Sequence, residues 1–233
     1  MKHPILKIEE ISPELYEVSD LRFERVWERT LWLFDLEATG LDTDRERVTQ
    51  IAGMAMRGGE LIESSAFEQY VALPAGVEIP KVVQELTGIS AQTLAGAPPF
   101  RQAWARHLAA AAGADLWLGQ SVFEFDVPLL FAEFARHGMP AELPSVLDSV
   151  VIATHLLGPP PAGERWSTSR LLARFQVDTT GLRRHDALHD VKILGRILAP
   201  MLRQLREERG DRLDIPAGKP LAIRRHPPVH SAG

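Results

Sequence analysis

The sequence predicts an α/β fold in which a mixed β-sheet is flanked by helices. The segment 31–37 is apolar on both faces until its carboxylates, which is typical of a central strand covered on both sides. Two strand-like segments joined by a tight turn follow it, and helical and strand-like segments then alternate. Strands joined by a hairpin pair antiparallel, whereas strands separated by helices pair parallel, so the predicted sheet is mixed.

The composition is that of an ordinary globular protein. The chain has 233 residues, of which 45% are hydrophobic and 24% charged, enough for one large domain or one domain with tails. The net charge of −5 shows that a basic surface is not its dominant feature. The absence of cysteine excludes a disulfide scaffold, a thiolate zinc site and a cysteine nucleophile. It fits a reducing, cytoplasmic location.

Neither a targeting signal nor a membrane span is expected. The first ten residues, MKHPILKIEE, lack the apolar core of a secretory signal. No run of about 18 apolar residues occurs, so we expect no contact with a membrane.

Three segments are expected along the chain. Residues 1–30 form an accessory segment, in which Ser12-Pro13-Glu14 predicts a helix start and 21–30 is either a strand or a short helix. Residues 31–206 form the main domain. Residues 207–233 are expected to be a mobile, proline-rich tail.

The strands of the main domain are bounded by turn residues. They are predicted at 31–37, 48–56, 61–73 and 115–119. Arg57-Gly58-Gly59-Glu60 suits a tight hairpin between the second and third strands.

Helices are predicted where apolar residues recur at helical spacing between Gly, Pro or cap residues. They span 80–86, 98–112, 125–137, 149–156, 167–175 and 187–205. Gly158–Gly163 must be a loop, and Pro200 should kink or shorten the last helix.

Asp35 and Glu37 are the first candidates for chemistry. Residues two apart in a strand point to the same face, so these carboxylates lie side by side in an otherwise apolar segment. Both are partly desolvated and repel each other, yet no Lys or Arg lies within 31–40. A divalent cation with a preference for oxygen ligands, Mg²⁺ or Mn²⁺, is the natural compensation.

Two later segments supply further acids and a histidine. Asp126 opens an apolar helix, where a simple helix cap is the alternative interpretation. HDALHD (185–190) places His185 just outside the last helix and Asp190 about one turn inside it. The alternative there is a capped helix whose acidic first turn is favoured by the helix dipole.

These residues together form a consistent hypothesis. Asp35, Glu37, Asp126 and Asp190 provide about the number of anionic ligands that a two-ion site for phosphoryl transfer needs. A histidine such as His185 can take a proton from water at neutral pH.

The order of these motifs resembles the DEDDh 3′–5′ exonucleases, the DnaQ-like family of proofreading exonucleases and ribonuclease T. The resemblance rests on FDLEATGLD (34–42), QELTGIS (84–90), GQSVFEFDVPLL (119–130) and HDALHD (185–190). It covers about residues 31–202, nearly the whole folded part. One departure is Gln120-Ser121, where many members of the family carry His-Asn.

The resemblance implies a fold, a metal site and a substrate. The fold is ribonuclease H-like, with a five-stranded mixed sheet flanked by helices, and residues 31–206 are the exonuclease domain. Asp35, Glu37, Asp126 and Asp190 would bind two Mg²⁺ or Mn²⁺ ions, and His185 would orient or deprotonate the attacking water. A further group of positions would line the 3′-terminal nucleotide: Ala38, Thr39, Gly40 and Leu41.

The substrate and partners are expectations of the same kind. Phe125 is a candidate for stacking on bases, as are Phe123 and Trp166, with core packing as the alternative. Arg183 and Arg184 are candidates for gripping phosphates, with a solvated loop as the alternative.

We expect single-stranded 3′ ends as substrate, DNA in preference to RNA, and a polymerase or repair partner. An RNA-trimming enzyme and a non-catalytic nucleic-acid-binding subunit on the same fold are the alternatives.

Overall fold

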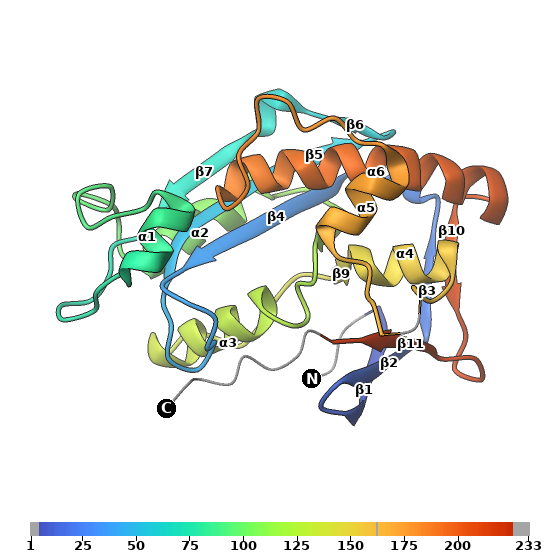
Figure 1. Cartoon of the computed structure of the whole chain (residues 1–233), viewed down its shortest axis with the longest axis horizontal. Coiled ribbons are helices and arrows are strands. Elements are labelled where there is room, and N and C mark those ends of the chain that lie inside the picture. Colours follow the sequence, from blue (N-terminus) through green and yellow to red (C-terminus); the bar gives the residue numbers. More distant parts are fainter. Residues whose placement is uncertain (1–4, 162, 226–233) are drawn as a thin grey trace.

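The computed structural model describes residues 5–161 and 163–225 and contains a mixed sheet between two layers of helices (Figure 1). The sheet runs in the order β6-β5-β4-β8-β9, and β7 also pairs with β5. Its strands are β4 (Leu31–Ala38), β5 (Val48–Arg57), β6 (Glu60–Leu61), β7 (Phe67–Tyr70), β8 (Leu116–Gly119) and β9 (Val146–Asp148). β5 is antiparallel to β4, β6 and β7, whereas β8 and β9 continue the sheet in parallel. The predicted mixed α/β fold is therefore confirmed.

The predicted hairpin lies at the turn between β5 and β6. Gly58 and Gly59 both have positive φ, 61° and 77°, which glycine adopts without steric cost. The segment predicted as one strand at 61–73 is instead divided by a 3₁₀ turn, η2 (Glu63–Ser65). The Ser65 hydroxyl accepts a bond from the Ala55 amide and donates to the Ile62 carbonyl, which stabilises the interruption. The sheet consequently has six strands rather than five.

The helices occupy both faces of the sheet. They are α1 (Lys81–Thr87), α2 (Phe100–Ala110), α3 (Asp126–Arg136), α4 (Ser149–Leu157), α5 (Thr168–Phe175) and α6 (Ala187–Arg209). Leu31 and Leu33 belong to a buried cluster with α4 and α6. Trp32, Phe34 and Leu36 belong to a second cluster with α2 and α3. Alternate residues of β4 therefore face opposite helical layers, as expected of a strand buried on both faces.

The last helix runs through its proline. α6 continues to Arg209 and ends at Gly210, which has a left-handed conformation, although Pro200 lies inside it. Pro200 removes one backbone donor, but the buried side chains around it, among them Ile197 and Met201, hold the helix against the sheet. The helix thus extends beyond the predicted end at residue 205, and the expectation that Pro200 would shorten it is wrong.

The two ends of the chain form small sheets with each other. β1 (Lys7–Ser12), β2 (Leu15–Ser19) and β11 (Leu221–Arg224) make one sheet, and β3 (Leu21–Glu24) pairs with β10 (Arg212–Ile215) in another. Figure 1 shows these strands together beside α4.

Two expectations for these ends are corrected. Ser12 ends β1, and Pro13-Glu14 forms the turn to β2, so this segment is not a helix start. Residues 21–30 hold β3 and then a 3₁₀ turn, η1 (Val26–Glu28). Within the predicted mobile tail, residues 212–215 and 221–224 are paired strands, and their side chains Leu213, Ile215 and Ile223 are buried in the core. The tail residues 226–233 lie outside the described residues. The domain boundaries at 30/31 and 206/207 stay predictions.

A search of the described residues for a membrane-crossing segment found no helix with both the length and the hydropathy required.

Candidate active site

The central strand directs two carboxylates toward the start of α6. Asp35 and Glu37 share a face of β4 with Leu31 and Leu33, and that face packs against α6. Opposite them on β5, Asp35 pairs with Ala52 and Glu37 with Gln50, before a bulge interrupts the ladder at Ala38. The predicted side-by-side arrangement of the two acids follows from this register.

Asp126 is brought to the same strand by α3. It is the first residue of the helix and 4% exposed, and its Oδ1 accepts a bond of 3.1 Å from the backbone N–H of Leu36. Leu36 lies between Asp35 and Glu37. The side chain of Asp126 is thus fastened to the central strand, so its role goes beyond that of a simple helix cap.

The start of α6 holds the third part of the cluster. Asp186 caps the helix by accepting a bond from the N–H of His189. Asp190, one turn inside, accepts a bond of 2.7 Å from the N–H of His185. Ligand atoms of Glu37, His185 and Asp190 all lie within 4.8 Å of one another. Three segments that are far apart in sequence therefore meet.

Burial and mutual repulsion make this cluster electrostatically costly. Burial raises the pKa of Asp35 well above its usual range, and the charges of Asp126 and Glu37 raise it further. The pKa of Glu37 is likewise raised, first by burial and then by the charge of Asp190. That of Asp126 is raised by burial and by the charge of Asp148, against hydrogen bonds from backbone N–H groups that lower it. Such a group of acids needs nearby positive charge.

The two arginines before His185 have partners within the chain. Arg184 Nε lies 2.5 Å from Asp190 Oδ1, and its charge lowers the pKa of Asp35 and Glu37. Arg183 donates a bond of 2.7 Å to the Thr87 carbonyl. The predicted contact of these arginines with phosphate stays a prediction.

The donor set fits hard divalent cations. Carboxylate oxygens and one imidazole, gathered within 4.8 Å, are ligands that Mg²⁺ or Mn²⁺ accepts. A bound dication would also relieve the repulsion that raises the pKa of each buried acid. These three residues thus fit such an ion, while the predicted ligand set of Asp35, Glu37, Asp126 and Asp190 stays a prediction.

Four of the predicted substrate-lining residues lie at the end of β4 and directly after it. Ala38 and Thr39 are buried, Gly40 is half-buried, and Leu41 is 63% exposed. The hydroxyl of Thr39 is bonded to the carboxylate of Glu46, and its N–H donates to the Arg47 carbonyl, so both groups are engaged within the protein. Phe125 is half-buried beside the second core cluster, directly before Asp126.

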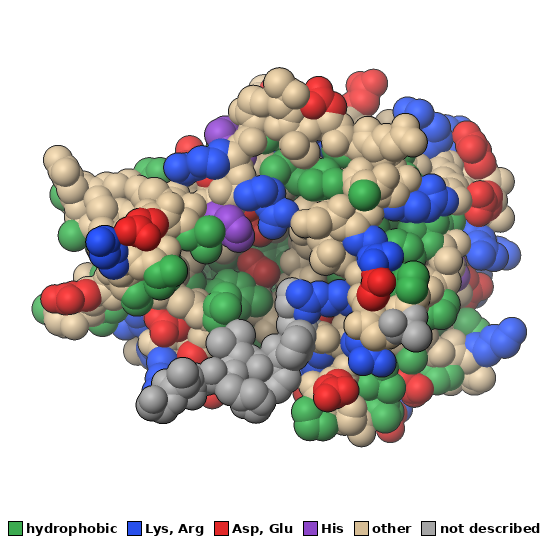
Figure 2. All heavy atoms as spheres, in the orientation of Figure 1, with side chains coloured by type: hydrophobic (Ala, Val, Ile, Leu, Met, Phe, Trp, Pro, Cys, Tyr) green, Lys and Arg blue, Asp and Glu red, His purple; other side chains and the backbone are tan. Residues whose placement is uncertain are grey.

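Figure 2 shows how the surface is shaped around this region. Carboxylate atoms lie in a hollow in the part of the face where Figure 1 places the start of α6 and α3. Histidine, Lys or Arg, and hydrophobic side chains gather around the hollow. Acidic side chains are thus open to solvent in this part of the face.

Asp148 was not identified from the sequence, although it holds the segment before Asp126. Its fully buried carboxylate accepts bonds from the N–H groups of Ser121, Phe123 and Val150. Burial raises its pKa to about 7. A lone Asp before an apolar helix is the available signal, and it indicates only a helix cap.

Gln120, one of the departures from the family pattern, connects the start of α4 to the segment before α5 through its side chain. Its side-chain amide donates to the Trp166 carbonyl at 2.9 Å and accepts from the Ser149 hydroxyl at 2.5 Å. Trp166 is itself 8% exposed, and its indole N–H donates to the Gly158 carbonyl. Trp166 is therefore a core residue in this structure, which agrees with the alternative to stacking on bases.

The mixed sheet carries two acids on its central strand, and an acid from the start of α3 and a histidine and an acid from the start of α6 lie near them. The fold is ribonuclease H-like. The model of the exonuclease family RNase_T matches residues 32–198, well over half of the chain. The chain belongs to this family, and the predicted membership among the DnaQ-like DEDDh exonucleases is confirmed.

Individual relatives agree with this assignment. The chain is 29% identical over 203 residues to DNA polymerase III PolC-type of Streptococcus mutans, covering 87% of this chain and 13% of that protein. It thus spans a small part of the curated relatives' length. Its fold is similar to the nuclease domain of 3′hExo, a DEDDh family member bound to rAMP, with a TM-score of 0.66, 17% identity and coverage of 76% and 93% of the two chains.

Exonuclease X in complex with 5′ overhanging duplex DNA is also similar, with a TM-score of 0.53, 18% identity and coverage of 74% and 91%.

Proposed function

We propose that the protein is a metal-dependent 3′–5′ exonuclease that releases nucleoside 5′-monophosphates from the 3′ ends of nucleic acids. The observation that carries this proposal is the meeting of Glu37, His185 and Asp190 within 4.8 Å, beside the buried Asp35 and Asp126. Membership in the exonuclease family supports the reaction type.

Each residue has a defined task in this reaction. Asp35, Glu37, Asp126 and Asp190 would hold two Mg²⁺ or Mn²⁺ ions, which supply Lewis-acid stabilisation of negative charge on the phosphate and the leaving oxygen. His185 takes a proton from the attacking water, whose oxygen bonds to phosphorus while the bond to the 3′ oxygen breaks. The proton on the new 3′ hydroxyl comes from solvent or from the protonated histidine. Ala38–Leu41 and Phe125 line the terminal nucleotide.

DNA is the proposed substrate class, with single-stranded 3′ ends preferred. The PolC-type relatives are DNA polymerases by name, and Exonuclease X was solved with duplex DNA, which support DNA and a polymerase or repair partner. RNA is the second candidate because a similar nuclease domain, 3′hExo, was solved with rAMP. A cytoplasmic location goes with this proposal and is checked by cell fractionation.

Digestion of end-labelled oligonucleotides tests the proposal. With Mg²⁺ we expect 5′-labelled DNA to shorten one nucleotide at a time from its 3′ end, and a chelator to stop the reaction. The digestion rates of matched DNA and RNA oligomers, with frayed and with paired 3′ ends, show which substrate is preferred. Binding of oligomers without any cleavage would instead indicate the non-catalytic subunit.

The Asp35→Ala variant tests the metal assignment. We expect it to lose nuclease activity while its circular dichroism spectrum stays that of the wild type. Full activity of this variant with added Mn²⁺ would contradict the metal role of Asp35.

A further inference from the structure

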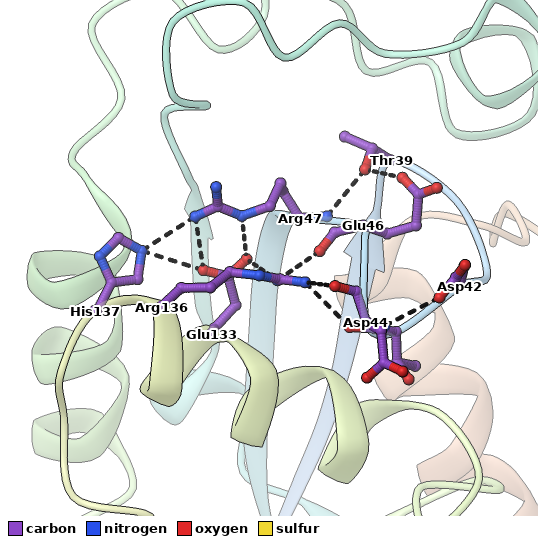
Figure 3. Close-up of polar contacts among 9 residues, drawn as sticks. Thr39, Asp42, Asp44, Glu46, Arg47, Glu133, Arg136 and His137 are labelled. Atoms are coloured by element: carbon purple, nitrogen blue, oxygen red, sulfur yellow. Dashed lines mark hydrogen bonds and ion pairs between the residues drawn. The ribbon is translucent and has the colours of Figure 1, made fainter.

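A buried ionic network lies at the far end of α3 from Asp126. The carboxylate of Glu133 is 1% exposed and contacts three cationic or titratable side chains (Figure 3). Arg47 binds it through two nitrogens, at 2.6 and 3.0 Å, and Arg136 and His137 each approach it to 3.1 Å. A carboxylate withdrawn from water needs such partners, because an unpaired buried charge is strongly destabilising.

The network joins α3 to the loop between β4 and β5, residues 39–47, hereafter the 39–47 loop. Arg47 is the last residue of this loop. Arg136 extends from α3 toward the loop and donates to three of its carbonyls, those of Thr43 at 3.4 Å, Asp44 at 2.5 Å and Glu46 at 2.7 Å (Figure 3). One guanidinium from the helix and one from the loop therefore share the carboxylate of Glu133.

The 39–47 loop is also closed on itself. The Thr39 N–H donates to the Arg47 carbonyl at 3.0 Å, and the Arg47 N–H donates back to the Thr39 hydroxyl at 2.9 Å. The carboxylate of Glu46 bonds to the same hydroxyl. Side chains thus hold the two ends of the loop together, and Arg136 holds its far side to α3.

Two sets of contacts made by α3 therefore fix the 39–47 loop relative to the acids of β4. At its start, α3 is tied to β4 by the bond from the Leu36 N–H to Asp126. Near its end, α3 is tied to the 39–47 loop by Glu133 and Arg136. The loop begins with the segment Thr39–Leu41 that lines the terminal nucleotide in the proposed function.

We propose that Arg136, together with Glu133 and Arg47, positions the wall of the nucleotide-binding site formed by Thr39–Leu41. This inference rests on the proposed function, since it assigns that wall a substrate. The three residues are positioning residues: they contact the 39–47 loop and not the acids of β4. Loss of the bonds from Arg136 frees the loop, which weakens the grip on the 3′ nucleotide and leaves the cleavage step intact.

Arg136→Ala tests the proposal, with Arg101→Ala as the matched control. Arg101 also donates to backbone carbonyls near the end of α3, those of His137 and Gly138, but it has no bond to the 39–47 loop. The loss of charged hydrogen bonds in Arg136→Ala is expected to raise KM for a DNA oligonucleotide roughly tenfold. We expect kcat to stay within about twofold of wild type, because the acids and His185 are untouched. Arg101→Ala keeps both constants.

Hydrogen exchange supplies a readout that does not depend on activity. The amides of Thr39, Arg45, Glu46 and Arg47 are bonded within the loop. We expect a peptide covering 39–47 to exchange faster in Arg136→Ala and unchanged in Arg101→Ala. Arg136→Lys keeps a positive charge beside Glu133 but offers only one ammonium group to the loop carbonyls. Its exchange rate in the 39–47 peptide should therefore lie between those of the wild type and Arg136→Ala. It is the variant of choice if Arg136→Ala does not fold.

The outcomes separate the two proposals. An active wild type whose KM and loop exchange are the same in the Arg136 variants would overturn the positioning role, as would a fall in kcat at constant KM. A folded wild type without 3′ cleavage would defeat the proposed function. In that case, if the 39–47 peptide exchanges at the wild-type rate in Arg136→Ala, the role of Arg136 in holding the loop is overturned as well. Faster exchange in this variant would support that role.

Discussion

His185 has a backbone conformation that its side chain makes unfavourable. Its φ of 62° lies in the left-handed region, which residues with a β-carbon seldom occupy. The bond from its N–H to Asp190 Oδ2 holds it there. Strain of this kind persists where the surroundings over-determine it, and here it directs the imidazole to the acids of the cluster.

His185→Ala tests the proton-transfer role at the residue scale. Removing a general base typically lowers turnover by about 10²–10⁴-fold, and we expect kcat to fall within that range. Mn²⁺ binding, measured by calorimetry, should persist because the carboxylates remain. His189→Ala, in the same segment, is the control and should keep most of the activity. Turnover of His185→Ala equal to wild type would remove His185 from the mechanism.

His107 is a second histidine with unusual surroundings. It is completely buried among aromatic rings, and its Nε2 accepts a bond of 2.7 Å from the indole N–H of Trp32. Burial lowers its pKa to about 3. The imidazole is therefore neutral in the folded core near neutral pH.

This histidine should make stability depend on pH. Between pH 6.5 and 3 the unfolded chain binds a proton at His107 that the folded protein excludes, so stability falls as pH falls. The loss approaches about 1.4 kcal/mol per pH unit below 6.5. The free energy of unfolding in urea is measured from pH 6.5 to 4.5 for the wild type and for His107→Gln. The other titrating groups are the same in both proteins, so the difference between the two pH dependences isolates the contribution of His107. If the free energy of unfolding falls with pH equally in the two proteins, the prediction is contradicted.

At the scale of elements, Asp148 joins the end of β9 to the start of α4 and to the segment before α3. Asp148→Ala removes a helix cap worth about 0.5–2 kcal/mol and the partner of two further amides. We expect the free energy of unfolding to fall by about 3 kcal/mol, and by less for Asp148→Asn. Chemical denaturation measures both. A loss below about 0.5 kcal/mol in the Ala variant would show that water replaces the carboxylate.

Local patterns predicted most of the elements and the acids of the site. An apolar context distinguishes Asp35 and Glu37 from Asp44 and Glu46, which have the same spacing in a polar segment. The structure agrees with that distinction: Glu46 bonds to Thr39 and belongs to the 39–47 loop. The local residue pattern is sufficient in these cases because the residues that distinguish the two pairs lie within one element or one loop.

Contacts between distant segments were beyond such patterns. Arg47 and Glu133 are 86 positions apart, and each looks like an ordinary surface residue in its own segment. β9 is only three residues long, too short for a periodicity. The tail 212–224 reads as irregular because its strands alternate over four residues each, and only their pairing with β3 and β2 orders them.

At the scale of the whole molecule, the C-terminal strands complete the core. Leu213, Ile215 and Ile223 are each at most 2% exposed and pack with residues of β2 and β3. A chain that ends after Asp211 loses all three, at about 1.5–3 kcal/mol for each buried side chain.

We therefore expect a fall in melting temperature of well over about 10 °C for this truncation, because about 1 kcal/mol shifts the melting temperature by 2–4 °C in a protein of this size. Removing only residues 226–233 is the control. A truncated protein that melts with the wild type would show that the terminal sheets are dispensable.

The pairing of residues 15–24 with 212–224 also has a consequence during synthesis. A ribosome makes β2 and β3 first, yet their partners emerge only about 190 residues later, at 5–20 residues per second. For roughly ten seconds or more the nascent polypeptide exposes unpaired strand edges. The sheets that hold β2 and β3 are therefore completed only after residues 212–224 have been synthesised.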